Sequence, residues 1–199
     1  MQERGVEVDH STINRWVLRY APELGQRIRP HLKLTNDSWR VDETYIKVRG
    51  VWKYLYRAVD SQGKTLDFML NAKRDGKAAA RFFRKVLEAQ HTKVPRVITV
   101  DKNDAYPAAM AALQEDETIA KETELRQSKY LNNMIEQDHR NIKRIVKPMM
   151  GFKSFNSARR TLSGIEAMNM IRKGQVKGIE QGDSVSQASF IEALFGISA

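Results

Sequence analysis

Three strand-like segments in close succession constrain the fold of this 199-residue chain most strongly. Residues 39–48, 53–59 and 65–71 are rich in β-branched and aromatic side chains, which favour strands. Only short turns, at residues 49–50 and 60–63, separate the three segments. Because short turns join antiparallel neighbours, the pattern predicts a three-stranded antiparallel meander.

A fourth strand is expected at residues 95–100, a compact apolar run of the kind that lies buried in a mixed sheet. If this strand lies beside the first strand of the meander, the order is that of RNase H-like domains, a mixed α/β sheet flanked by helices. Residues 115–124 are acidic and are expected to form a loop or a short strand. Apolar periodicity predicts four helices, at residues 76–90, 104–115, 130–146 and 157–173.

The N-terminal segment also has a helical pattern. From Ser11 onward, apolar residues recur at the spacing of one helical face, and they are Ile13, Trp16, Val17 and Tyr20. The opposite face carries Thr12, Asn14, Arg15 and Arg19. Residues 21–38 contain Pro22, Gly25 and Pro30, so we expect a connector with a short helical piece. Residues 175–199 are rich in Gly, Gln and Ser and are expected to be loose until an apolar patch at 190–197.

Composition restricts the class of protein. The excess of 34 Lys and Arg over 24 Asp and Glu gives a net charge of +10, which favours a polyanionic partner, either nucleic acid or an acidic membrane surface. The absence of cysteine excludes disulfides and thiolate metal sites and fits a reducing cytoplasm. No apolar run approaches the roughly 18–20 residues that span a bilayer. A glycine-rich phosphate loop and a G-x-S-x-G motif are also absent.

Three carboxylates are candidates for a metal site. Asp42 lies inside the first strand, where a charge is costly unless it has a partner or faces a site. Asp101 directly follows the buried strand, at the end where ligands gather in α/β sheets. Glu136 lies within the long helix expected at 130–146. Taken singly, each could be a solvated surface residue, but together they offer the oxygen ligands that Mg²⁺ prefers.

The helix that carries Glu136 has a basic face. Lys143 lies seven residues further on, about 700° around the helix and about 10.5 Å along it, so it stands on the same side as Glu136. Arg140 lies between them. Such a face suits a helix along a phosphate backbone, and the alternative is a Glu–Arg pair on a solvated helix, worth a few tenths of a kcal/mol.

Neighbouring carboxylates are weaker candidates. Glu43 alternates to the opposite face of the strand from Asp42. Asp104 is better placed to cap the following helix than to bind a metal. Asp138 lies about 200° from Glu136 on the helix and is expected to face away from the site.

Long stretches of the chain resemble DDE transposases of the insertion-sequence-6 family of bacterial elements. The similarity covers nearly the whole chain from Arg4. Thirty-four residues separate Asp101 from Glu136, as in the DDE triad of that family, and Lys143 matches its trailing basic residue. The segments that carry the resemblance are 39–60, 100–107, 130–144, 151–155 and 158–168.

The resemblance implies an RNase H-like, retroviral-integrase-like fold and a magnesium-dependent DNA transposase. Such an enzyme cuts at the terminal inverted repeats of its element and joins the freed 3′-hydroxyls to a target duplex. Asp42, Asp101 and Glu136 would hold two Mg²⁺ ions, with Mn²⁺ as a substitute, which activate the attacking oxygen and stabilise the leaving oxygen. Arg140 and Lys143 would position the DNA.

Residues 6–20 resemble the recognition-helix half of the N-terminal helix-turn-helix of the family. The side chains that would meet the terminal repeat in the major groove are Thr12, Asn14, Arg15 and Arg19. The helices that precede this half in the family are missing from the sequence, so we expect a partial motif. The expected organisation is a helix-turn-helix segment and connector at 1–34, a catalytic domain at 35–175 and a tail at 176–199.

The implied partner is double-stranded DNA, both element ends and target, and the implied location is the bacterial cytoplasm, at the nucleoid when bound to DNA. The two mirror-image ends of an element imply at least a homodimer on DNA, and no membrane is involved. Two other functions stay open at this stage. One is a truncated, non-catalytic DNA-binding regulator of transposition, and the other is an RNase H-like nuclease that cuts without joining.

Overall fold

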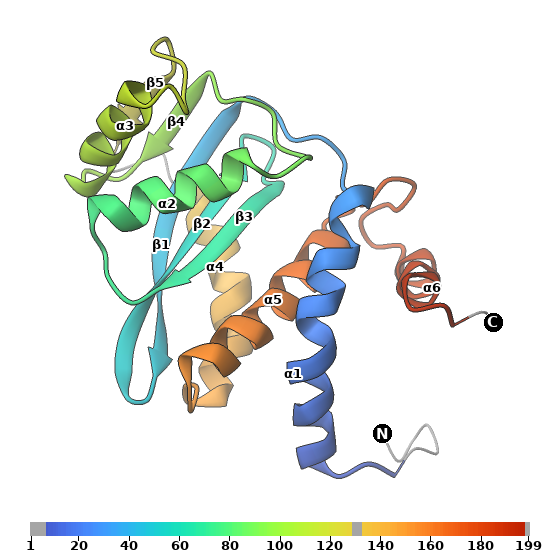
Figure 1. Cartoon of the computed structure of the whole chain (residues 1–199). Helices are drawn as coiled ribbons and strands as arrows, with labels where there is room; N and C mark the ends of the chain where they lie inside the picture. The colour runs from blue at the N-terminus through green and yellow to red at the C-terminus, as the bar shows by residue number, and fades with distance from the viewer. Residues whose placement is uncertain (1–6, 129–132, 198–199) are drawn as a thin grey trace. The chain divides into compact units, whose positions relative to one another are not determined.

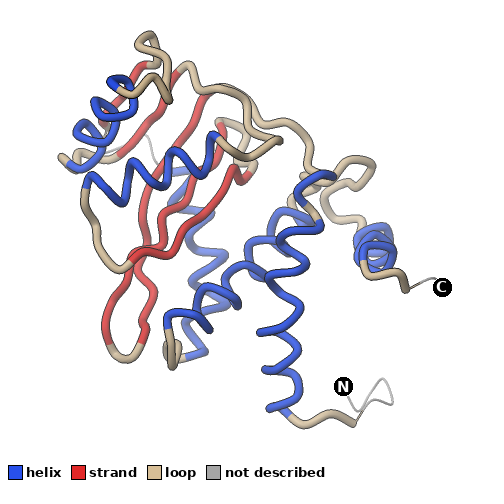
Figure 2. The backbone as a smooth tube through the Cα atoms, viewed as in Figure 1, coloured by secondary structure: helices blue, strands red, loops and turns tan. Residues whose placement is uncertain are grey.

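The computed structural model describes residues 7–128 and 133–197, and its elements fall into two compact units, Leu32–Phe152 and Met1–His31 with Lys153–Ala199. Figure 1 shows the elements along the chain, and Figure 2 shows the same view coloured by secondary structure. The first unit, here called the sheet unit, contains β1 (Ser38–Val48), β2 (Val51–Asp60), β3 (Thr65–Asn71), α2 (Gly76–Leu87), β4 (Val97–Val100), α3 (Ala105–Glu115), β5 (Glu124–Gln127), α4 (Asn133–Val146) and η3 (Lys147–Met149). The second, here called the helical unit, contains α1 (His10–Arg27), η2 (Arg29–His31), α5 (Phe155–Arg172) and α6 (Ser184–Leu194).

The sheet has five strands in the order β3-β2-β1-β4-β5. β1, β2 and β3 form the antiparallel meander that the sequence predicts, and β4 lies parallel to β1, which confirms the predicted position of the later strand. The pairing of β1 with β4 covers Ser38–Arg40, opposite Val97–Thr99. β1 is therefore the central strand, and Asp42 lies just beyond the stretch that β4 covers.

Helices cover both faces of the sheet. Figure 1 shows α2 in front of the sheet, with α3 beside it, and α4 behind. The core between the sheet and the helices α2 and α3 contains fully buried aromatic side chains, among them Trp39, Phe82 and Tyr106. The N-terminus of α2 is fixed by Asp75, whose carboxylate accepts the backbone N–H of Ala78 at 2.8 Å.

α4 is attached to the sheet through a buried ion pair as well as apolar contacts. Ile135 and Ile142 are fully buried, and Asp138 pairs with Arg57 of β2 at 2.6 Å, with side chains 6% and 0% exposed. Asp138 therefore faces away from the surface that carries Glu136, as the helical geometry predicts. The predicted helix at 130–146 is observed from Asn133, and residues 130–132 lie outside the described part of the chain.

α1 continues to Arg27, so the prediction of a connector from residue 21 is wrong. Pro22 lies inside the helix, where its ring nitrogen cannot donate a hydrogen bond to the carbonyl of Leu18. The guanidinium of Arg160, on α5, donates to that carbonyl instead. A residue far along the chain thus supplies the donor that the proline removes.

The contact between α1 and α5 depends on small residues. A Cβ atom added to Gly164 would lie 2.5 Å from the Cβ of Ala21, and one added to Gly25 would lie 2.5 Å from Oγ of Ser163. Larger side chains at these glycines would therefore force the two helices apart. The predicted apolar face of α1 is partly open to solvent, and the side chain of Trp16 is 43% exposed.

The C-terminal segment is more ordered than the composition predicts, because residues 184–194 form α6. The carboxylate of Asp183 accepts the backbone N–H of Ser186 at 3.0 Å, which caps the helix. None of the helices in residues 7–128 and 133–197 combines the length and the apolar character needed to cross a bilayer.

Candidate active site

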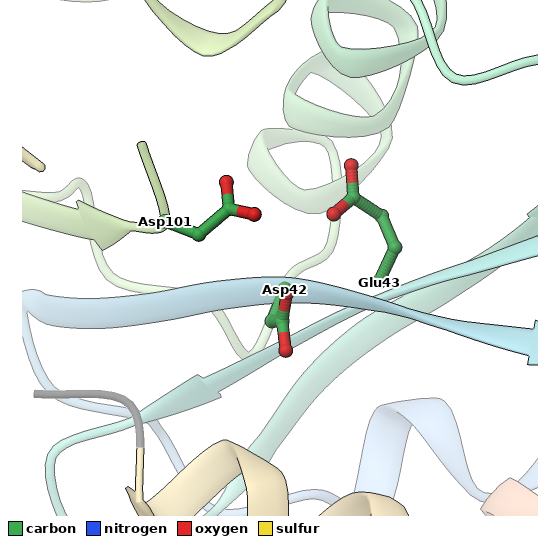
Figure 3. Close-up of side chains that lie close together, drawn as sticks. All are labelled: Asp42, Glu43 and Asp101. Atoms are coloured by element: carbon green, nitrogen blue, oxygen red, sulfur yellow. The ribbon is translucent and has the colours of Figure 1, made fainter. Parts of the chain in front are cut away.

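Three carboxylates meet in the middle of the sheet unit. Asp42 and Glu43 are neighbours on β1, and Asp101 directly follows β4. One oxygen atom from each lies within 4.8 Å of the others (Figure 3). β1 and β4 are adjacent parallel strands, so the sheet order itself brings Asp42 and Asp101 together.

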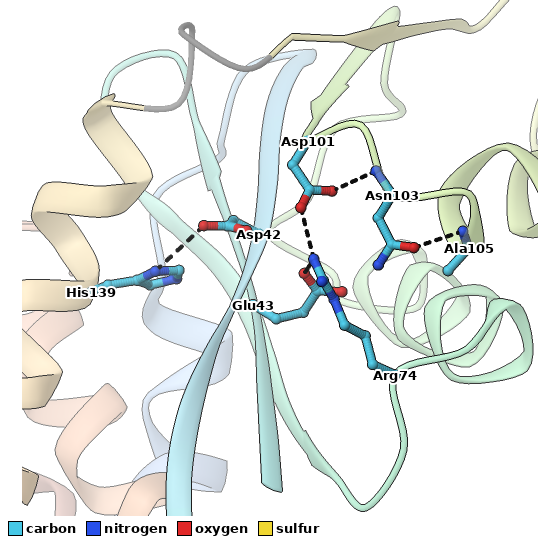
Figure 4. Close-up of polar contacts among 7 residues, drawn as sticks. All are labelled: Asp42, Glu43, Arg74, Asp101, Asn103, Ala105 and His139. Atoms are coloured by element: carbon cyan, nitrogen blue, oxygen red, sulfur yellow. Dashed lines mark hydrogen bonds and ion pairs between the residues drawn. The ribbon is translucent and has the colours of Figure 1, made fainter. Parts of the chain in front are cut away.

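Asp42 and Glu43 point to opposite sides of β1, as alternation along a strand requires (Figure 4). Asp42 points toward α4, with a carboxylate oxygen 3.7 Å from Nδ1 of His139. Glu43 points toward Arg74, whose guanidinium donates to Glu43 at 3.0 Å and to Asp101 at 2.7 Å. The sequence argument set Glu43 aside because of its face, and it gave no signal for Arg74.

Local hydrogen bonds hold Asp101 in place. The backbone N–H of Asn103 donates to Oδ1 of Asp101 at 3.1 Å, and the side-chain oxygen of Asn103 accepts the N–H of Ala105 at 3.0 Å. The predicted cap, Asp104, occupies the N-cap position of α3, but its side chain makes no capping hydrogen bond. Asn103 satisfies the first turn of α3 instead, so the loop after β4 is fixed on both sides of the carboxylate.

Burial leaves negative charge at Asp42 poorly compensated. Desolvation and, to a smaller extent, the carboxylates of Glu43 and Asp101 raise the pKa of Asp42 to about 7. Burial, together with the charges of Arg57 and Lys143, lowers the pKa of His139 to about 3. His139 is therefore neutral at neutral pH, and its contact with Asp42 is not an ion pair.

This environment fits a divalent cation. The donor atoms are carboxylate oxygens alone, the ligand type that magnesium and manganese accept. A cation beside Asp42 would lower its raised pKa and offset the cost of burying the charge. The side chains of Asp42 and Asp101 are 20% and 35% exposed, so the cluster stays accessible to an ion.

Glu136 lies outside this cluster. It is in the first turn of α4, it is exposed, and it is not among the described carboxylates that fall within 4.8 Å of one another. His139, three residues further along α4, contacts Asp42. α4 thus passes beside the cluster, with Glu136 about one turn from the point of contact, and the role of Glu136 as a ligand stays a prediction.

The predicted DNA-contacting residues lie in both units. Arg140 and Lys143 are exposed on α4, in the sheet unit. Asn14, Arg15 and Arg19 are exposed on α1, in the helical unit, and Arg15 donates to the hydroxyl of Thr12 at 2.9 Å. Their DNA contacts stay predictions.

Comparison with known proteins gives consistent results. The family model of the DDE domain of the IS240 type matches residues 36–175. A transposase for the insertion sequence-like element IS431mec of Staphylococcus aureus is 42% identical over 180 residues, which cover 90% of this chain and 78% of the relative. The transposase for insertion sequence element IS257 in transposon Tn4003, also from Staphylococcus aureus, is 41% identical over the same shares of both chains.

Solved structures show the same fold at low sequence identity. The catalytic core domain of HTLV-2 integrase, in its dimeric form in complex with magnesium, has a TM-score of 0.52 and 14% identity, over 75% of this chain and 94% of that one. The catalytic core domain of BIV integrase has a TM-score of 0.52 and 13% identity, over 79% of this chain and 97% of that one. The predicted retroviral-integrase-like fold is therefore confirmed.

The sheet order and the helices on both faces define an RNase H-like fold. The match to the DDE family model and the transposase relatives make the chain a polynucleotidyl transferase. More specifically, the chain belongs to the insertion-sequence-6 family of DDE transposases. The family match ends at residue 175, close to the predicted domain boundary, whereas the compact units divide after Phe152. α5 is therefore part of the family domain in sequence and part of the helical unit in structure.

Proposed function

We propose that this transposase cuts DNA at the terminal inverted repeats of its element and joins the freed 3′-hydroxyls to a target duplex, with Asp42, Asp101 and Glu136 as its metal ligands. The observation that carries the proposal is the approach of Asp42 and Asp101 from adjacent strands of an integrase-like sheet. Relatives that share about two fifths of its residues are transposases.

Asp42 and Asp101 would hold magnesium, with manganese as a substitute, and Glu136 would complete the ligand set from α4. When bound, the metal activates the attacking water or 3′-hydroxyl and stabilises charge on the leaving oxygen. Arg74 and the N–H of Asn103 fix the orientation of Asp101 before metal arrives. His139, kept neutral by burial, leaves the carboxylate of Asp42 available for the ion.

The exposed cations of α4 would bind the DNA backbone. Arg140 and Lys143 follow Glu136 along α4 toward its C-terminus. A DNA strand that lies along this helix would pass the carboxylates first and these two cations next. Two inverted ends in one assembly require at least a dimer on DNA. Such an enzyme works in the bacterial cytoplasm, at the nucleoid when DNA-bound.

The test is a strand-transfer assay with the full chain, a pre-cleaved terminal repeat, a target duplex and Mg²⁺. A loss of several kcal/mol of transition-state stabilisation lowers the rate of strand transfer by about 10³-fold. We expect losses of at least that size for Asp42→Asn, Asp101→Asn and Glu136→Gln, and for removal of metal with EDTA. Asp116→Asn, at an exposed carboxylate that follows the C-terminus of α3, is the matched control and should stay within about twofold of wild type.

The third ligand is tested by comparing two glutamates. Glu43 belongs to the observed cluster but is held by Arg74, whereas Glu136 lies on α4 outside it. If Glu136→Gln retains joining while Glu43→Gln abolishes it, Glu43 is the ligand and the proposed triad is wrong. Binding of terminal repeats without cutting or joining would instead identify a regulator, and nicking without joining would identify a nuclease.

A further inference from the structure

A groove lies in the sheet unit between the β1–β2 hairpin and the C-terminal end of α4. Its volume is about 640 Å³, within the range of small-molecule binding sites, about 300–1,000 Å³. Buried aliphatic side chains, Ile46 and Val146, form part of its lining. The exposed side chains around it are Tyr45, Lys47, Trp52, Lys143, Lys147 and Met150.

The groove follows from the way β1 is paired. β4 covers β1 over Ser38–Arg40, and in the described part of the chain no further pairing between these two strands follows. At the far end of β1 the chain returns after α4, and the N–H of Phe152 donates to the carbonyl of Lys47 at 2.8 Å. Gly151 permits this return, because its φ is +110° and an added Cβ would lie 3.1 Å from the carbonyl oxygen of Lys47.

The aromatic side chains of the groove are unusually exposed for their size. Trp52 is 58% exposed and Tyr45 is 51% exposed, and their ring centroids lie 6.4 Å apart in an edge-to-face arrangement. Nζ of Lys47 lies 5.9 Å from the centroid of the Trp52 ring. Exposed rings interleaved with lysines are typical of surfaces that stack bases and bind phosphates.

The charges of the groove select among occupants. Three of the residues that line it are lysines, and none of the described lining residues is acidic. A second copy of this chain, with its net charge of +10, is a poor partner for such a surface. An occupant that combines a flat apolar ring with negative charge, a nucleotide, matches both the rings and the lysines.

The position of the groove along two elements relates it to the carboxylates. Lys143 is seven residues beyond Glu136 on α4, about 10.5 Å along the helix. Tyr45 is three residues beyond Asp42 on β1, about 10 Å along the strand, and its side chain lies on the Glu43 face of the strand. A stacked DNA strand advances about 3.4 Å per nucleotide along its axis, so either distance corresponds to about three stacked nucleotides between the carboxylates and the groove.

We propose that this groove binds an unstacked nucleotide of single-stranded DNA, with its base against Trp52 and Tyr45 and its flanking phosphates at Lys143 and Lys147. The inference rests on the proposed function, in that the nucleotide belongs to the strand held at the carboxylates, about three positions from the phosphate that reacts. A base in the groove cannot stack in a duplex, so the groove selects DNA that is frayed or single-stranded near the cut.

The test measures binding in EDTA, which separates it from metal-dependent chemistry. Fluorescence anisotropy with the full chain gives Kd values for a 12-nucleotide single strand and for the corresponding duplex. Since base stacking on an aromatic ring is worth about 1–3 kcal/mol, Trp52→Ala should weaken single-strand binding about tenfold or more and duplex binding less than twofold. Trp52→Phe, which keeps a ring, should restore most of the affinity.

Two matched controls and a crosslink complete the experiment. Val94→Ala, at an exposed apolar residue outside the groove, should leave both Kd values unchanged. Lys147→Gln should lower the salt dependence of single-strand binding by about one ion, whereas Lys121→Gln should not. A strand that carries 5-iodouracil should crosslink to the peptide that contains Trp52 or Tyr45.

The proposal fails if Trp52→Ala changes single-strand affinity less than twofold and no crosslink maps to the groove. It also fails if the same variant alters the sedimentation of the free protein but not its DNA binding, since the groove would then be a protein interface. Strand transfer that persists in Asp42→Asn overturns the proposed function alone, whereas unchanged single-strand affinity in Trp52→Ala overturns the proposed role of the groove alone.

Discussion

The sheet unit and the helical unit bury different kinds of side chain. The sheet unit packs large aromatic residues such as Trp39 and Phe82 and also buries charges, including the pair Arg57–Asp138. The helical unit brings α1 and α5 together through small residues, Ala21 and Gly164 among them. The sheet unit therefore packs through large rings around its buried ion pair, whereas the helical unit, which buries Glu166 as well, has close helix contacts that only small residues allow.

The difference relates to what each unit does with its surface. In the sheet unit, the buried charges include the candidate active site. Burial raises the pKa of Asp42 there, next to the carboxylates of Glu43 and Asp101. In the helical unit, the exposed side chains of α1 include Trp16 and Tyr20, at 43% and 41%. The sheet unit thus combines a buried carboxylate site with exposed rings such as Trp52, whereas the described surface of α1 exposes aromatic side chains without such a site.

The largest expected effect is in the sheet unit. Arg57→Met removes the cation that neutralises Asp138 inside the protein, and breaking a buried pair from one side costs about 3–5 kcal/mol. Urea unfolding followed by circular dichroism should show this loss. The double variant Arg57→Met/Asp138→Leu should recover most of it, because no uncompensated charge remains buried.

The matched control for this prediction is an exposed pair in the same unit. Lys93 and Asp37 lie 3.9 Å apart with side chains 65% and 37% exposed, so Lys93→Met should cost less than about 1 kcal/mol. Equal losses for Arg57→Met and Lys93→Met would show that the buried pair does not stabilise the attachment of α4, and the contrast between the units would lose its basis.

A smaller effect is expected in the helical unit. Gly164→Val places side-chain atoms where Ala21 already lies, and overpacking of this kind costs about 1–3 kcal/mol. Amide hydrogen exchange should become faster in α1 and α5 while the amides of β1 and β2 keep their protection, because the two groups of elements form separate compact units.

Ala188→Val, on the exposed surface of α6, adds two methyl groups and a small helix penalty without the close approach, and should cost only about 0.5 kcal/mol. Faster exchange in the strands of the Gly164→Val protein would mean that the two units unfold together, which is the result that would count against their independence.

The smallest expected effect is a gain in stability. Asp42 has a pKa of about 7 in the folded protein against 3.8 for the free side chain, so the unfolded chain ionises first as pH rises. The contribution of protonated Asp42 to the free energy of unfolding is fully present below about pH 4 and is lost as pH rises to about 7. Asp42→Asn should therefore be about 1–2 kcal/mol more stable than wild type at pH 8 in EDTA, and no more stable at pH 3.5.

Magnesium should reverse this order. Wild type should gain thermal stability on addition of Mg²⁺, since a ligand that binds the folded state stabilises it, and Asp42→Asn should gain much less. Asp116→Asn, at an exposed carboxylate, should follow wild type in both conditions. A lower melting temperature for Asp42→Asn than for wild type at pH 8 in EDTA would mean that burial does not destabilise the Asp42 charge.

Most of the sheet unit could be predicted from sequence because local pattern and tertiary structure agree there. β3 occupies residues 65–71 as predicted, and β1 and β2 are extended at their ends by one or two residues. Two elements of the helical unit could not. α1 passes through Pro22 because Arg160 replaces the missing donor, and α6 forms behind the cap of Asp183 in a segment whose composition indicates a loop.

The site was predictable only in part. Asp42 and Asp101 could be selected because each is a charge placed against an apolar strand, a conflict that is visible in sequence. Arg74 and the approach of Glu43 could not, since they depend on where the loop between β3 and α2 lies in space. The ligand role of Glu136 was suggested by family spacing, and its position on α4 leaves that role for experiment.

The division of the helical unit into two stretches of sequence has a consequence for synthesis. α1 leaves the ribosome before the sheet unit, yet Arg160 and the close contact at Gly164 come about 140 residues later. The intervening sheet unit is continuous in sequence, so it can fold while α1 still lacks its partner. Completion of α1 would then be among the last steps of folding, after Asp42 and Asp101 have already come together in the sheet unit.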